Sequence, residues 1–184
     1  MGKATKDRGV QVSAPPLQMP NASSIAEDVT SKALDFCARK LGVDGPKAAA
    51  VCLSRRDYNA LDYCHYSMAE QVGAALGSLD DNVQTVYMFD YDATAEDICF
   101  DESPFTPLVH LLVRVERKTE ALNALIAMLD RALARSYAKI VGPEGLQHLL
   151  DVQIIDTQDV AQRKGYGALL SSLHHRPLKV WNRA

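Results

Sequence analysis

The chain lacks the features that mark membrane, secreted and general nucleic-acid-binding proteins. No apolar run approaches the roughly 18 residues that a membrane-spanning helix needs. The first residues do not follow the basic, apolar and small-residue order of a signal peptide. Basic residues are not in excess, since 20 Lys and Arg stand against 23 Asp and Glu, and a net charge of −3 argues against broad binding to nucleic acid. We therefore expect a soluble, cytoplasmic protein without membrane contact.

Cysteine is scarce, and its spacing predicts no metal site. The four cysteines are scattered and form no Cys-x-x-Cys pair. Such spacing favours free, partly buried thiols in a reducing compartment over a zinc site. Cys64 is followed by His65, but adjacent side chains seldom face each other, so the pair does not predict a catalytic thiol.

Length and hydrophobic content bound the number of domains. A chain of 184 residues with 47% hydrophobic content suits a single domain. Residues 1–21 carry three prolines and little periodicity, which predicts a flexible arm. We expect residues 22–184 to form one domain whose first part, residues 22–66, is helical.

Capping signals predict the helices of the first half. Two Ser-x-x-Glu capping boxes, which begin at Ser24 and Ser67, predict helix starts, and Gly42 and Gly77 predict the matching ends. Residues 48–53 form an apolar run too short to distinguish helix from strand.

The second half carries the strand signals. A regular helix is predicted over residues 120–140, and Asp156 is placed to cap a last helix. Short apolar runs predict strands over residues 83–89, 108–115 and 149–155, and an edge strand over residues 177–181. This order predicts an α/β or α+β fold, a small mixed sheet with helices packed on it.

The hexapeptide Phe-Asp-Tyr-Asp-Ala-Thr at the end of the first predicted strand holds the most informative polar pair. In an extended chain Asp90 and Asp92 point to the same face, so both can address one cation or one phosphate. With His110 and Asp151 they would form a site for Mg²⁺ or Mn²⁺, since both residue types are ligands for these ions. The alternatives are a solvated strand end for the two aspartates and a core histidine at position 110.

The order of elements over residues 67–160 resembles the minimal nucleotidyltransferase core of the DNA polymerase β superfamily. Residues 86–89 resemble the first strand of that core, and residues 111–113 resemble the apolar run that follows its Asp-x-Asp motif. Residues 149–155 resemble its third strand, with a carboxylate at Asp151. The resemblance implies a nucleotidyltransferase-like fold, a small mixed sheet with helices packed on it.

The family motifs are only partly present. Asp90-Tyr91 stands where the family has Gly-Ser, and the Asp-x-Asp positions fall on Leu108 and His110, which leaves Asp151 as the one matching carboxylate. Two-metal phosphoryl transfer needs several converging carboxylates. The resemblance therefore implies a degenerate, non-catalytic member that binds a nucleotide-like ligand or a protein partner.

Two further expectations concern activity and assembly. The hexapeptide also resembles the first motif of haloacid dehalogenase-type phosphatases, where the first Asp is the nucleophile and the second the general acid and base. The alternative function, through this motif or through the metal site with His110 and Asp151, is a metal-dependent phosphotransferase or phosphatase that uses Asp90 and Asp92, with Asp151 as a further catalytic residue. Sheet edges and the apolar segment around Trp181 favour a homodimer or another protein partner.

Overall fold

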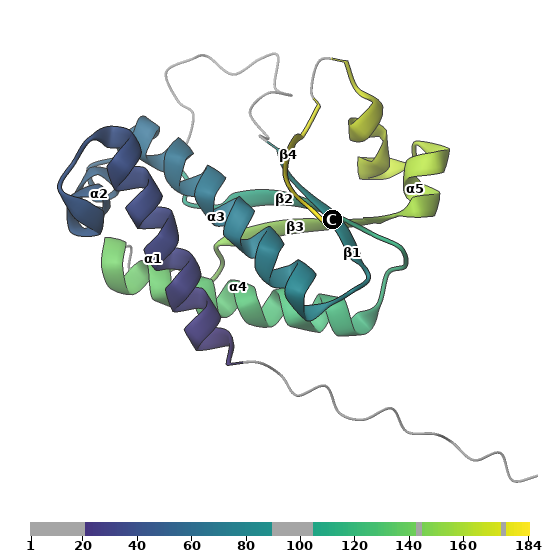
Figure 1. Ribbon diagram of the computed structural model, residues 1–184, viewed down its shortest axis with the longest axis horizontal. Coiled ribbons are helices and arrows are strands. Elements are labelled where there is room, and N and C mark those ends of the chain that lie inside the picture. Colours follow the sequence, from purple (N-terminus) through teal and green to yellow (C-terminus); the bar gives the residue numbers. More distant parts are fainter. Residues whose placement is uncertain (1–20, 90–104, 143–144, 174–175) are drawn as a thin grey trace, which may run out of the picture.

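The computed structural model describes residues 21–89, 105–142, 145–173 and 176–184, and it shows an α+β fold (Figure 1). In chain order the elements are α1 (Ala22–Leu41), α2 (Gly45–Ser54), α3 (Tyr58–Leu79), β1 (Val83–Met88), β2 (Val109–Val115), α4 (Glu120–Val141), β3 (Leu150–Asp156), α5 (Thr157–Gln162), the 3-10 helix η2 (Gly165–Ser171) and β4 (Leu178–Asn182). No helix in these ranges is both long and apolar enough to cross a membrane.

The four strands form one mixed sheet in the order β3-β2-β1-β4. β2 and β3 run parallel and are connected through α4, whereas β1 is antiparallel to both β2 and β4. The four predicted strands are confirmed to within one residue at each end, and the last is an edge strand as expected. The long apolar run of the chain became β2 because that strand lies inside the sheet, with both faces covered.

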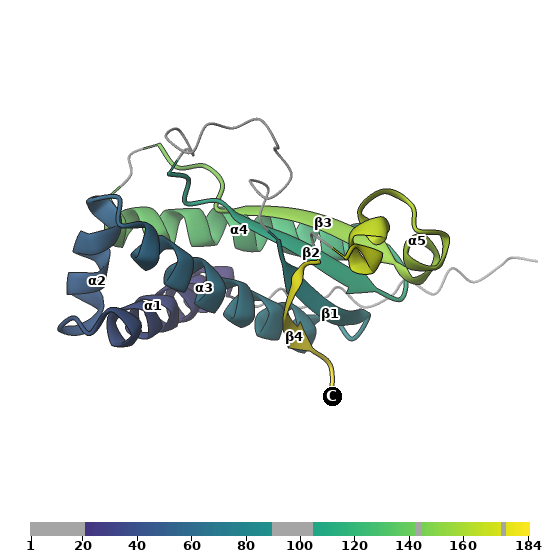
Figure 2. The ribbon, with the colours of Figure 1, turned by 90° about the horizontal axis from the view of Figure 1, so that it is seen from above.

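Different helices lie at the two faces of the sheet, as Figures 1 and 2 show. α3 and α4 pack on one face, here called the helix face, and α1 contacts both of them. α5 and η2 lie at the other face, here called the second face. Side chains of a strand alternate between the two. On β2, Val109, Leu111 and Val113 enter the core of the helix face, and His110 and Arg114 belong to the second face.

The first helix begins earlier than predicted. Asn21 is the N-cap of α1, and its side chain accepts a hydrogen bond from the Ser24 backbone N–H at 3.4 Å. The prediction that Ser24 starts the helix is wrong because Asn21, itself a preferred N-cap residue, takes that position one turn upstream. The predicted end is confirmed, since Gly42 has a left-handed φ of 68° and its N–H bonds the Ala38 carbonyl.

The predicted break near Ser67 does not exist, and the helical segment runs past residue 66. α3 is one helix that starts after Asp57, whose carboxylate accepts from the Ala60 N–H at 3.1 Å. Ser67 is only 2% exposed and lies inside it. Gly77 also lies inside α3, which continues to Leu79. A glycine is needed at this position because the Trp181 indole of β4 fills the space that a Cβ would occupy.

The remaining helices settle the other boundaries. Residues 48–53, ambiguous in sequence, are helical as part of α2, which carries a proline in its first turn. α4 confirms the predicted helix, and Thr119 is its N-cap. The last helix is capped by Asp156 as predicted, but it is split: α5 ends at Gln162, its C-cap Arg163 has a left-handed φ of 51°, and η2 follows.

Candidate functional site on the second face

Two of the four predicted site residues are brought together by the sheet. His110 on β2 and Asp151 on β3 are direct partners in the parallel register. The His110 Nδ1 and the Asp151 Oδ2 are 3.0 Å apart, and the two side chains are 16% and 30% exposed. Asp90 and Asp92 lie outside the described residues. Of the four residues, His110 and Asp151 therefore lie in direct contact.

Asp151 joins a third side chain to this pair. Gln153, two residues along the same strand, donates from Nε2 to the Asp151 Oδ1 at 3.1 Å. The carboxylate thus accepts one hydrogen bond on each oxygen, which fixes its orientation. An ionised Asp151 makes His110 donate from Nδ1, and a neutral ring then carries its lone pair on Nε2. The three side chains present an imidazole, a carboxylate and an amide in a row along the second face.

Aromatic rings border this polar row. The Phe89 ring centroid lies 5.7 Å from that of His110 and 6.0 Å from that of Tyr166 in η2. The Phe89 N–H also donates to the His110 carbonyl at 3.2 Å, so the end of β1 is tied to the start of β2. Ring faces next to hydrogen-bonding edges suit a flat ligand with polar edges. No pattern in the sequence predicted that Tyr166 would reach this position.

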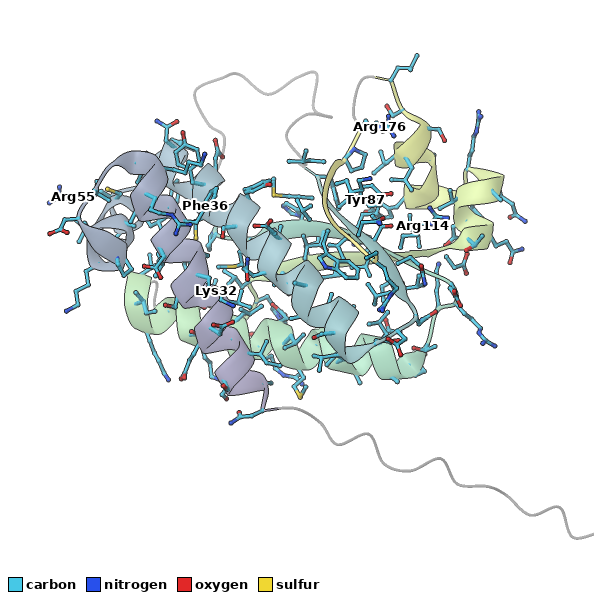
Figure 3. All side chains as sticks on the ribbon, viewed as in Figure 1. Lys32, Phe36, Arg55, Tyr87, Arg114 and Arg176 are labelled. Atoms are coloured by element: carbon cyan, nitrogen blue, oxygen red, sulfur yellow. The ribbon has the colours of Figure 1, made fainter. Side chains whose placement is uncertain are left out.

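Arg114 is a second feature of this face. On β2 it lies opposite Thr85 of β1 and Ile155 of β3. Its Nε is buried, and within the described ranges it has no hydrogen-bond partner. Figure 3 labels Arg114 and Tyr87 on the sheet, on the side where η2 lies. Sequence reasoning missed Arg114, although an arginine inside an otherwise apolar strand was the available signal.

The predicted metal site remains a prediction. In the part of the chain that the structure describes, no three or more His, Cys, Asp or Glu side chains are grouped so as to hold a metal ion. His110 and Asp151 supply two side chains that can bind a metal ion, and the predicted site for Mg²⁺ or Mn²⁺ would also need Asp90 and Asp92.

The thiols in the helical part are free, and two of them are buried. Cys37, Cys52 and Cys64 form no disulfide, as the sequence predicted. Burial, and then the neighbouring Cys37, raises the pKa of the Cys64 thiol to about 12. Burial also raises the pKa of Cys37 to about 11. Cys64 is therefore protonated at neutral pH, and it is no nucleophile for His65 to activate.

The topology does not fit the dehalogenase-type alternative. That fold places its first motif on a strand of a parallel sheet of about five strands, whereas β1, which ends just before the hexapeptide, is antiparallel to both of its neighbours.

Comparisons with family models, with curated proteins and with solved structures find no match to this chain.

Proposed function

We propose that the protein is a non-catalytic binding protein with a nucleotidyltransferase-like core, and that it holds a nucleotide-like ligand on the second face. The observation that carries this proposal is the cross-strand pair of His110 and Asp151 beside the rings of Phe89 and Tyr166. Protein sites hold nucleobases by stacking against aromatic rings and by hydrogen bonds to the base edges. Gln153, bonded to Asp151, adds the amide that such an edge can meet.

The order of elements supports the nucleotidyltransferase-like part of the proposal. α3, β1, β2, α4 and β3 follow one another as in the family core, with β2 and β3 parallel. His110 and Asp151 stand at positions where the family has carboxylates. Because Leu108 and His110 replace the Asp-x-Asp pair, the chain offers too few acids for the family's two-metal chemistry, which supports a binding role.

Location and assembly belong to the same proposal. Free thiols suit the reducing cytoplasm. The exposed edge of β4, where Leu178 is 51% exposed, supports a homodimer or another protein partner.

The second candidate is a metal-dependent phosphotransferase or phosphatase. The hydrogen bond from the Phe89 N–H to the His110 carbonyl favours it, because Asp90 follows Phe89 directly in the sequence. In this candidate Asp90, Asp92, His110 and Asp151 surround one Mg²⁺ or Mn²⁺.

A thermal-shift and calorimetric screen separates the two candidates. Adenosine, AMP, Mg²⁺ and Mn²⁺ are titrated against the wild type and His110→Ala, with His148→Ala as the matched control. His148 also pairs with an aspartate, Asp130, but it follows α4 and is 66% exposed. At a ligand concentration of 100 times Kd, binding to the folded state adds about 2.7 kcal/mol.

The binding role predicts that adenosine or AMP raises the melting temperature of the wild type. We expect His110→Ala to weaken binding about tenfold or more, a loss of about 1.4 kcal/mol, and His148→Ala to bind normally. Binding should persist in the double variant Asp90→Asn, Asp92→Asn. A metal response that this double variant abolishes would instead support the enzyme, and no response to adenosine or AMP would refute the binding role.

A further inference from the structure

We propose that Arg114, Tyr87 and Lys179 form an anion subsite on the second face that binds a phosphate group. The inference deepens the proposed function, on which it rests for the identity of the whole ligand as a nucleotide. The subsite itself is argued from the surroundings of Arg114.

Among the residues that the structure describes, no counter-charge pairs with Arg114. Its neighbours on the two adjacent strands, Thr85 and Ile155, are 4% and 2% exposed, so the base of its side chain is enclosed. The Nε is buried without a partner, and the guanidinium forms no ion pair within the described ranges. A partly buried cation of this kind loses hydration that only an anion or strong acceptors can replace.

Two further groups that attract anions lie on the same face. Tyr87 pairs with Leu112, two residues before Arg114, and is therefore its diagonal neighbour across β1 and β2. Lys179 is the partner of Tyr87 on β4 and is exposed. Three strands thus contribute a guanidinium, a phenol and an ammonium group to one part of the second face.

The carboxylates of the neighbouring elements are committed elsewhere. Asp159 binds the Lys118 Nζ at 2.6 Å, an interaction that lowers the pKa of its carboxyl, and it also accepts from the Asp156 N–H in the capping box of α5. Glu116 accepts from Gln84 at 3.4 Å. Asp151 bonds His110 and pairs with it across β2 and β3, four residues before Arg114. At about 3.3 Å per residue this places Asp151 about 13 Å from Arg114 along the strand direction. None of these acids neutralises Arg114.

A phosphate group fits the three donors. The planar guanidinium can donate two parallel hydrogen bonds to phosphate oxygens, and Lys adds a point charge. Leu112, between Arg114 and His110 on β2, is fully buried. Because Leu112 lies between them, the phosphate subsite at Arg114 and the aromatic rings beside His110 are separate contacts for a ligand. Each contact can be tested alone.

The test is calorimetric titration of the full chain with inorganic phosphate and pyrophosphate at constant ionic strength. Arg114→Met keeps an apolar stem and removes the charge. Arg131→Met is the matched control, because it removes the same charge from an exposed position on α4. That helix packs on the opposite face of the sheet from the proposed subsite. Lys179→Met alters an exposed position and provides a second variant whose folding does not depend on buried packing.

We expect the wild type and Arg131→Met to bind phosphate equally, Arg114→Met to bind about tenfold more weakly or worse, and Lys179→Met to lose several-fold. Without ligand, Arg114→Met should melt at a higher temperature than the wild type, because it removes an unpaired buried donor. Equal phosphate affinity in Arg114→Met and Arg131→Met, or no phosphate binding by the wild type, would overturn the subsite.

Adenosine separates this inference from the proposed function. Adenosine lacks phosphate, so Arg114→Met should bind it as the wild type does, whereas His110→Ala should not. Phosphate binding without adenosine or AMP binding would keep the subsite and refute the nucleotide. Adenosine binding that persists while phosphate fails to bind would refute the subsite alone.

Discussion

Gly77→Ala is expected to lower the free energy of unfolding by about 2–3 kcal/mol, although alanine is the better helix former by about 1 kcal/mol. A Cβ at this position would overlap the Cη2 and Cζ2 atoms of Trp181, and a Cβ at Gly73 would lie 2.7 Å from the Trp181 Cβ. The indole therefore has to leave its place on α3. Urea denaturation measures the change, and the fluorescence of the single tryptophan reports on whether the ring has moved.

A double-mutant cycle with Trp181→Ala isolates the packing cost. Without the indole the space beside α3 is open, so Gly77→Ala should then stabilise the protein by up to about 1 kcal/mol. The same destabilisation in both backgrounds would contradict the account. The contact matters for the second face because Trp181 positions β4, which carries Lys179.

Asp130→Ala is expected to cost about 3 kcal/mol or more. Asp130 is buried, with its side chain 9% exposed, and its carboxylate accepts from the N–H groups of Leu149 and Leu150 at 2.7 and 2.8 Å. Removing it leaves two buried donors unsatisfied, each at a cost of about 1–3 kcal/mol. Chemical denaturation measures the loss. Because Leu150 directly precedes Asp151, the variant should also weaken ligand binding at the His110 pair.

The control separates the backbone contacts from the histidine contact. His148 Nδ1 lies 2.6 Å from Asp130 Oδ2, but its side chain is largely exposed, so His148→Ala should cost less than about 1 kcal/mol. Asp130→Asn keeps one acceptor oxygen and should fall between the two. If His148→Ala proved as damaging as Asp130→Ala, the backbone contacts would not be the main stabilising interaction.

Much of the fold could be predicted because local signals agreed with their surroundings. The apolar run of β2 predicted an interior strand, and α4 has both a regular apolar face and a glycine after its last turn. The errors arose where a local signal was overridden by tertiary contacts. Ser67 resembles an N-cap but is buried inside α3, and Gly77 resembles a helix stop but makes room for an indole about a hundred residues later.

The site was predictable in part for the same reason. His110 and Asp151 were grouped from strand order, and the parallel register makes them partners. Tyr166 and Lys179 could not be grouped with them, because neither the path of η2 nor the pairing of β4 with β1 follows from periodicity. Arg114 was visible as a charge in an apolar strand, but only the structure showed that its Nε has no partner in the described ranges.

The most direct test of the binding role is a map of ligand contacts by ¹H–¹⁵N correlation spectra during titration with AMP. The account predicts that the largest shift changes fall on the second face, at the amides of Phe89, His110, Gln153 and Tyr166. Resonances of α1 and α4 should change little. Shift changes concentrated on those two helices, or none at saturating AMP, would contradict the assignment of a nucleotide site to this sheet.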